Sequence, residues 1–289
     1  MVNNSTVEDA PFILLDADNN HNPHLFEAYR YDRNCSQHWT EIVRGCLICW
    51  RITAQAFYER IPETGFQKLG LGGILNPHGT AQLPPTPPED TNITRNTAVT
   101  DLTEILALRL LQWKKGSVAI PYPRVLHKEV SQLQHHGIDA IGYELTTSGH
   151  LLYVIEVMAS VDLNHPPTTV RDHLSQILDE TLNVNRSPRL LRDLQIAHDE
   201  SDDSHKDVLN GFITAVIDGT ISNGISVVAA PLLVRRFNEH DANDWLPFVN
   251  HSQSFEHAII PSHILFLTVE CHDSFSGMLD LVKQTATQP

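Results

Sequence analysis

Three apolar runs of strand length most constrain how this chain can fold. They are residues 150–159 (HLLYVIEVMA), 225–234 (ISVVAAPLLV) and 263–270 (HILFLTVE). Such runs are rich in Val, Ile and Leu, and helical patterns separate them, which is typical of strands buried in a covered sheet. We therefore expect an α/β fold in which helices flank a mixed central sheet.

The helices are predicted from apolar residues that recur at three- and four-residue spacing. The longest covers residues 37–59, and the helix at 99–113 is apolar around most of its circumference and should be buried. Two lysines and a glycine follow it and suit a helix end. Further helices are expected at 166–182, 187–197, about 205–217 and 273–283, with an acidic, solvated loop at 198–207.

The N-terminal part is polar and mixed, with one short strand expected at 11–17. Residues 63–96 are rich in Gly and Pro and predict a long loop. Residues 117–137 predict a Pro-punctuated segment followed by a short polar helix or turn. We divide the chain into an N-terminal extension with a long helix and this loop, residues 1–97, and a core, residues 98–289.

The net charge of −15 sets a condition on any function that involves nucleic acid. A protein that holds DNA alone needs a basic face to displace counterions from phosphates. The four cysteines do not form a disulfide framework, and no segment predicts a signal peptide or a membrane span. We expect a cytoplasmic protein. If it acts on DNA, either its basic residues cluster locally or a partner protein binds the DNA.

Two acids stand where a metal site could form. Residues 138–145 and 150–159 predict two strands joined by a turn, and an antiparallel pairing would bring Asp139 to Glu156. Glu156 lies in a strand that is apolar on both faces, where a carboxylate is costly unless a cation compensates it. Two carboxylates and a strand carbonyl make the hard-oxygen site that Mg²⁺ prefers. The alternative is a turn-forming Asp and a Glu in a salt bridge.

These residues resemble the PD-(D/E)xK nuclease superfamily, which has the restriction-endonuclease-like fold. The resemblance rests on Gly-x-Asp, a hairpin, then Ile-Glu-x-x-x-Ser and an amphipathic helix, and it covers about residues 98–182. More narrowly, IPYPRVLHKE, HHGIDAIGYE and LYVIEVMAS are similar to the nuclease subunit of the Hachiman anti-phage defence system. That resemblance implies a Mg²⁺- or Mn²⁺-dependent deoxyribonuclease that acts on DNA with a helicase subunit as partner.

The resemblance assigns roles to four residues of the hairpin. Asp139 and Glu156 match the two metal-binding acids. Ser160 matches a small polar residue often seen two places after the lysine position, and it is a candidate for substrate binding. Met158 stands where the family has its catalytic lysine. Methionine keeps the length of lysine but lacks its charge and its donors, so we expect the chain to cut poorly or not at all.

Three further residues are candidates. Glu104 shares a helical stripe with Leu108 and Leu111, and the family often adds an acid from such a helix as a metal ligand. A buried structural ion pair explains Glu104 equally well. Arg171 and Lys128 are candidates for substrate phosphate contacts or for a cation that replaces the lysine, and solvated surface is the default for Arg171.

Three explanations of Met158 stay open: an engineered substitution, a naturally degenerate member, or replacement of the lysine by a nearby cation. Two functions follow. The first is a metal-dependent DNA nuclease subunit of a helicase–nuclease defence complex, impaired as written. The second is a catalytically inactive, nuclease-like module that binds and restrains a helicase partner.

Overall fold

The computed structural model describes residues 10–21, 24–32, 34, 38–46, 92–123, 125, 138–147, 149–171, 188–221, 224–252 and 263–287. Their centre is one seven-stranded sheet with the order β1-β2-β7-β6-β5-β4-β3. The strands are β1 (Phe12–Asp18), β2 (Leu25–Tyr31), β3 (Ala119–Pro123), β4 (Ala140–Thr146), β5 (Gly149–Ser160), β6 (Ile225–Arg235) and β7 (His263–Glu270). The middle strands β5, β6, β7 and β2 are parallel, and antiparallel pairs lie at both edges. The expected α/β class with a mixed sheet is confirmed.

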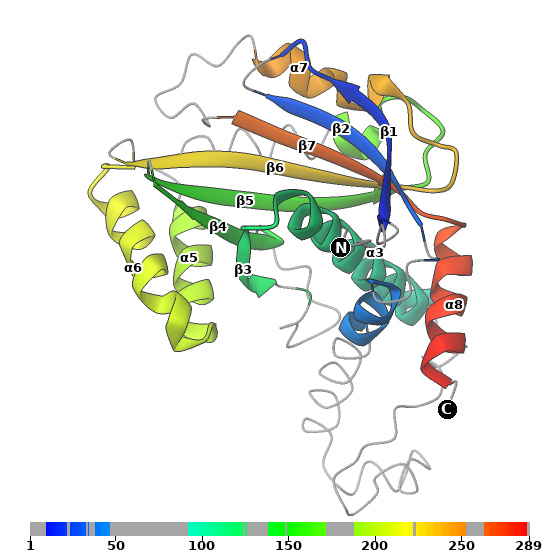
Figure 1. Ribbon diagram of the computed structural model, residues 1–289, viewed down its shortest axis with the longest axis horizontal. Helices are drawn as coiled ribbons and strands as arrows, with labels where there is room; N and C mark the ends of the chain where they lie inside the picture. Colours follow the sequence, from blue (N-terminus) through cyan, green and yellow to red (C-terminus); the bar gives the residue numbers. More distant parts are fainter. Residues whose placement is uncertain are drawn as a thin grey trace, which may run out of the picture.

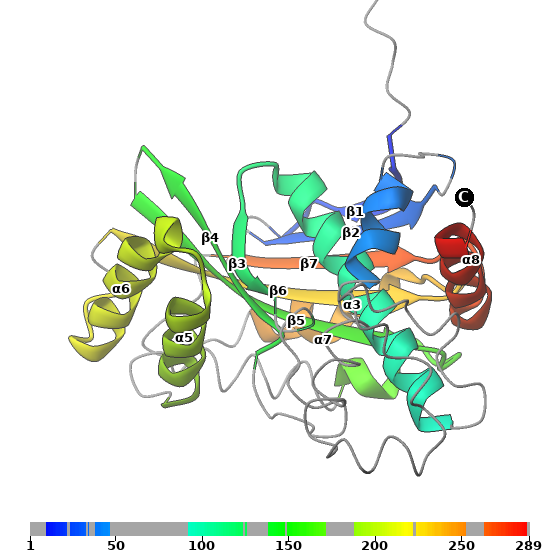
Figure 2. The same ribbon diagram turned by 90° about the horizontal axis from the view of Figure 1, so that it is seen from below.

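Helices cover both faces of this sheet (Figures 1 and 2). On one face, α3 (Asn92–Lys115) packs against the odd-numbered residues of β5, such as Tyr153 and Ile155, and α8 (Phe275–Thr287) packs against α3. On the other face, α5 (Pro188–Glu200) and α6 (Asp203–Ile217) cover the part of β5 that contains Leu152 and Val154, and α7 (Leu246–Ser252) covers parts of β6, β7 and β2. The structure also has a 3-10 turn, η4 (Ala242–Trp245), and a helical segment at 38–46.

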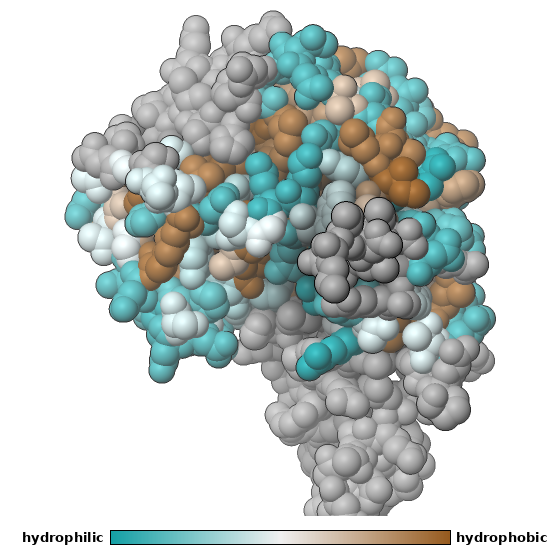
Figure 3. All heavy atoms as spheres, viewed as in Figure 1, coloured by the Kyte–Doolittle hydropathy of each residue, from teal (hydrophilic) through white to brown (hydrophobic). Residues whose placement is uncertain are grey.

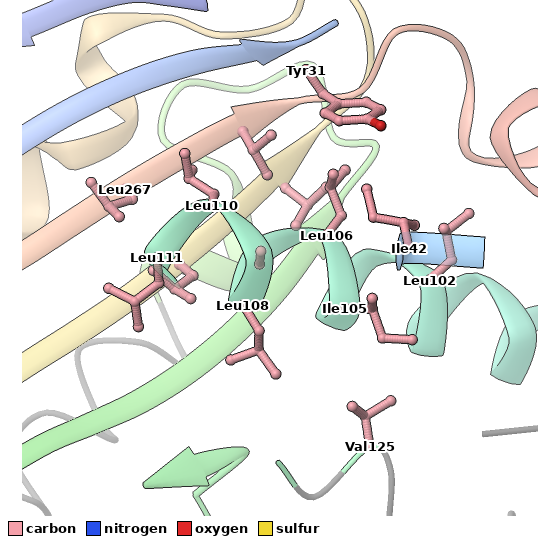
Figure 4. Packing of buried hydrophobic residues seen from close by; sticks show 14 of the residues in the cluster. Tyr31, Ile42, Leu102, Ile105, Leu106, Leu108, Leu110, Leu111, Val125 and Leu267 are labelled. Carbon is pink, nitrogen blue, oxygen red and sulfur yellow. The ribbon is translucent and has the colours of Figure 1, made fainter. Parts of the chain in front are cut away.

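Helix α3 is buried on several sides, as its apolar sequence predicted. Leu102, Leu106 and Leu110 are all almost fully buried. Figure 4 shows the α3 side chains between the strands, the helical segment that carries Ile42, and Val125. The predicted end is also confirmed: the helix stops after two lysines, and the next residue, a glycine, adopts a left-handed conformation with φ of 60°.

The apolar runs form the strands they predicted. The expected strands at 11–17, 138–145, 150–159, 225–234 and 263–270 correspond to β1, β4, β5, β6 and β7. Two strands were not predicted. β2 (LFEAYRY) mixes polar residues into its run, and β3 (AIPYP) lies in the Pro-punctuated segment, where we expected no strand. Prolines are compatible with β3 because it is an edge strand, whose outward N–H groups are not needed by the sheet.

Two loop predictions are wrong. The acidic segment 198–207 is mostly helical, because α5 runs to Glu200 and α6 begins at Asp203, leaving only two residues between them. The loop predicted to 96 ends earlier, since α3 begins at Asn92. The other parts of that loop lie outside the described residues, as do most of the helices predicted at 37–59 and 166–182; residues 38–46 and 168–171 of these are helical.

The sheet takes strands from both sides of the proposed division at residue 97, because β2 pairs with β7. The division itself stays a prediction. In the described part of the chain, no helix combines the length and the apolar character that crossing a bilayer requires.

Candidate metal site

The β4–β5 hairpin brings the two predicted acids together. Ala140 pairs with Ile155 and Ile141 with Val154, so continuing this register by one residue places Asp139 opposite Glu156. A hydrogen bond supports this placement, because the Val157 N–H donates to Asp139 Oδ2 at 2.8 Å. Opposite residues in an antiparallel pair have Cβ atoms about 4.5–5.5 Å apart. The side chains of Asp139 and Glu156 therefore start from neighbouring positions where β4 begins.

β5 continues beyond the start of β4. The last five residues of β5, Glu156 to Ser160, pair with β6 on one side, whereas β4 pairs with β5 only as far as Ile155. In a strand, the N–H and C=O of one residue point to the same side. Because the Val157 N–H points toward Asp139, the Val157 carbonyl faces the same edge. The edge thus presents a backbone oxygen beside the two acids.

A structural role for Asp139 also has support. Its carboxylate accepts the hydrogen bond from the Val157 N–H, which a backbone carbonyl would accept if β4 and β5 continued to pair. Asp139 therefore ends the ladder of backbone hydrogen bonds between these strands. The preceding amide, Ile138 N–H, donates to Asp193 Oδ2 of α5 at 3.0 Å. A carboxylate offers about four acceptor positions, so one bond to an amide is compatible with a further bond to a cation.

Glu156 lies between two apolar clusters on one face of the sheet. Val154, two residues before it, belongs to the cluster beneath α5 and α6. Met158, two residues after it, packs against the cluster that contains Val170 and Trp245. The Glu156 side chain is half-buried, and its neighbour on β6 is Pro231. A carboxylate in such surroundings is destabilising unless a cation or hydrogen bonds compensate its lost hydration.

Met158 occupies an apolar position. Its neighbour on β6 is Leu233, and both contribute to the cluster formed with α7 and η4. The thioether fills this space without a charge or a donor. The predicted alignment of Glu156 and Met158 on one face is confirmed by the register of β5 with β6.

Glu104 approaches from the other face of the sheet. It lies on α3, is 5% exposed, and its Oε1 accepts the Val125 N–H at 3.1 Å. Because Pro123 at the end of β3 pairs with Ala140, Val125 lies near the start of β4. The structure thus gives Glu104 a backbone partner near the acids. Its ligand role stays a prediction.

The other candidates are less central. Ser160 ends β5, is 4% exposed, and its Oγ accepts the Asp162 N–H at 3.1 Å, so it holds the following turn. Arg171 is exposed at the end of the described helical segment 168–171. Lys128 lies outside the described residues. Their roles in substrate binding remain predictions.

A second polar group, not predicted from sequence, lies four residues along the same face of β5. Arg235 on β6 pairs with Ser160 and is fully buried. Its Nε is 3.4 Å from Asp244 Oδ2 and donates to the Glu239 carbonyl at 3.0 Å, while Nη1 donates to the Asp162 carbonyl at 2.8 Å. The Arg235 guanidinium thus forms hydrogen bonds to the loop that follows β5 and to the loop that follows β6.

His165 and Asp244 complete this Arg235 network. His165 Nδ1 lies 2.8 Å from Asp244 Oδ1, and Asp244 is fully buried. Burial raises the pKa of Asp244, whereas the hydrogen bond from His165 and the charge of Arg235 oppose that rise. In the same turn, the backbone N–H groups of Asn164 and Thr168 lower the pKa of Asp162 to about 2. The one signal in the sequence was an arginine at the end of an apolar strand.

Among the described residues, no group of three or more His, Cys, Asp and Glu side chains could hold a metal ion. A cation at this hairpin would therefore bind two carboxylates, a backbone oxygen and water. No protein-family model matches the chain, and neither a curated protein nor a solved structure matches it.

Proposed function

We propose that this chain is a metal-dependent DNA nuclease subunit of a helicase–nuclease anti-phage defence complex, and that Met158 leaves it cutting DNA slowly or not at all. The proposal is carried by one observation: the hairpin register sets Asp139 opposite Glu156, with the Asp139 carboxylate bonded to the Val157 amide. The helix α3 before the hairpin and the helical segment 168–171 after it agree with the resemblance to the PD-(D/E)xK superfamily.

The residues present fit Mg²⁺ or Mn²⁺. Mg²⁺ in phosphoryl-transfer sites is commonly held by one or two carboxylates and keeps several waters. Asp139, Glu156 and the Val157 carbonyl would hold it here. When bound, such an ion activates water and neutralises the negative charge that develops on the phosphate. Asp139 remains oriented by the Val157 amide, and the apolar residues on both sides of Glu156 limit access of bulk water.

Met158 explains why we expect weak cleavage. It points from β5 on the same side as Glu156, at the position where the superfamily places lysine, and it packs against apolar side chains. A missing electrostatic group beside the reacting atoms typically lowers kcat by about 10²- to 10³-fold. Binding of metal and DNA does not require that group.

The acidic composition supports the need for a partner. With a net charge of −15, the chain as a whole repels DNA phosphates. With a helicase partner that already holds and moves DNA, this subunit would not need a basic DNA-binding face of its own. The substrate would then reach the hairpin through the partner and not by long-range attraction to this subunit.

The second function, an inactive module that binds and restrains a helicase, is favoured by the packing of Met158. An apolar side chain that completes a buried cluster stabilises the domain, and a lysine there would not. In this view the acids keep the shape of the hairpin, with Asp139 as the end of the strand ladder.

Substitution of Met158 by Lys separates the two functions. The purified chain and Met158→Lys are each assayed for Mg²⁺-dependent DNA cleavage, alone and with a helicase that co-purifies with the chain. The nuclease proposal predicts a gain of about 10²- to 10³-fold. The gain should vanish in Met158→Lys combined with Glu156→Gln, and Met158→Leu serves as the uncharged control. A folded Met158→Lys protein that gives no cleavage with the helicase present favours the inactive module.

A further inference from the structure

Strand β1 is an exposed edge with an unusual composition. It is the terminal strand of the sheet and pairs with β2 only, among the described residues. Three consecutive aliphatic side chains on it are exposed: Ile13 by 50%, Leu14 by 53% and Leu15 by 36%. Figure 3 shows hydrophobic side chains gathered on the surface in the region where Figure 1 places β1. Such an edge is a template for another strand.

The opposite edge of the same sheet is protected. Strand β3 contains Pro121 and Pro123, which have no N–H to offer, and all of its side chains are half-buried. Strand β1 (FILLDAD) contains neither proline nor lysine, the residues that commonly block an edge. Its one irregularity is a bulge between Leu14 and Asp16, so the edge pairs regularly from Phe12 to Leu14 and again from Asp16 to Asp18.

The hydrogen bonds to β2 show which backbone groups face outward. Asp32 N–H donates to the Pro11 carbonyl at 2.8 Å, so residue 11 faces β2. Because the direction alternates along a strand, Ile13 also faces β2, whereas the N–H and C=O groups of Phe12 and Leu14 point away from it. These outward groups can pair with an added strand without breaking any bond to β2.

Charge indicates what kind of strand would pair there. β1 carries Asp16 and Asp18, which are partly exposed, and no basic residue. The whole chain has a net charge of −15, so a second copy would meet electrostatic repulsion. A basic extended segment would meet attraction and would cover the exposed aliphatic side chains with its own apolar residues.

We infer that β1 is a docking edge for an extended segment of a partner protein in which basic and apolar residues alternate, and which adds to the sheet as an eighth strand. Main-chain bonds to Phe12 and Leu14 provide the pairing, and Ile13 to Leu15 provide the apolar contact. Docking at β1 involves neither the acids of the hairpin nor Met158. A test of this docking is therefore independent of nuclease activity.

A peptide of alternating lysine and valine tests this inference on the full chain. Binding is measured by fluorescence anisotropy, and hydrogen exchange of the β1 amides is followed with and without peptide. We expect slower exchange at Phe12 and Leu14. Leu14→Pro removes an outward N–H without removing a bond to β2 and should weaken binding roughly tenfold or more. The control Leu14→Thr keeps the N–H and should weaken binding less.

Two peptide controls separate strand pairing from attraction of charges. A lysine peptide with alternate valines replaced by proline keeps the charge and should not bind at β1, and a glutamate–valine peptide should bind weakly. Equal binding to the chain and to folded Leu14→Pro, or unchanged exchange in β1, would overturn the inference. A dimer that forms without peptide and is lost in Leu14→Pro would also overturn it, because the occupant would then be a second copy.

Discussion

Two polar groups lie on the same face of β5, four residues apart, and they differ in how their charges are compensated. At Ser160, the buried Arg235 is matched by Asp244 and by two backbone carbonyls, so opposite charges and acceptors meet within the protein. At Glu156, the residue across the hairpin is another acid, Asp139. Like charges placed directly opposite on neighbouring strands destabilise a sheet.

The difference is what we expect if the Arg235 network is structural and the acid pair binds a cation. The Arg235 network needs nothing from outside and fixes the loops after β5 and β6. At the hairpin, a cation would add to the favourable interactions of two acids that lie opposite each other. Mutations in the two groups should therefore have opposite consequences: large losses of stability in the network, and small losses of stability but a loss of metal binding in the acid pair.

The largest expected effect is that of Arg235→Met. It leaves the buried Asp244 with His165 but without Arg235, and removal of one partner from a buried ion pair typically lowers the free energy of unfolding by about 3–5 kcal/mol. Urea unfolding followed by circular dichroism measures the change. Arg236→Met is the matched control, because Arg236 pairs with Glu239 at the surface and should matter by about 0–1 kcal/mol. Similar effects of the two substitutions would contradict the structural role of Arg235.

Glu104→Ala should have the next largest effect. It leaves the buried Val125 N–H without its acceptor, which lowers the free energy of unfolding by about 1–3 kcal/mol. Glu104→Gln keeps an acceptor and should restore most of the stability. Metal titration of Glu104→Gln adds a second result: weaker binding would make Glu104 a third ligand, and unchanged binding would restrict its role to structure.

The Asp162 turn should show a smaller, pH-dependent effect. Because the folded-state pKa is about 2 and the ordinary value is 3.8, ionised Asp162 stabilises the folded protein above about pH 4. This contribution is lost as the pH falls from about 4 toward 2. Thermal unfolding of the chain and of Asp162→Asn should differ by a constant amount at neutral pH, and the difference should shrink on acidification. A difference that grows on acidification would contradict the lowered pKa.

The sequence predicted the strands β1, β4, β5, β6 and β7 but not β2 and β3. Long apolar runs identify β5, β6 and β7 because these strands are buried on both faces. β2 contains polar residues and pairs with β7, which is far away in the sequence, and β3 contains two prolines. The acidic segment 198–207 was misassigned because charged residues suit an exposed helix as well as a loop, and composition does not separate the two.

In the candidate site, too, the sequence predicted local relations between residues but not the long-range contacts. Strand alternation was enough to align Glu156 with Met158, and hairpin pairing was enough to bring Asp139 to Glu156. The Arg235 network joins residues that are about seventy positions apart, such as Arg235 and Asp162, so no local pattern could predict it. The hydrogen-bond partner of Glu104 could not be predicted either, because it is a backbone amide in a different segment of the chain.

Metal binding to the hairpin tests the central claim most directly. Mn²⁺ or Mg²⁺ is titrated into the chain while thermal unfolding is recorded, and into Asp139→Asn combined with Glu156→Gln, which keeps both side-chain sizes and an acceptor for the Val157 N–H. A site with metal at ten times its Kd gains about 1.4 kcal/mol of stability, or a rise in Tm of about 3–6 °C. We predict this rise in the chain and its loss in the double variant. An equal rise in both proteins, or none in the chain at millimolar metal, would contradict the claim that these two acids form a metal site.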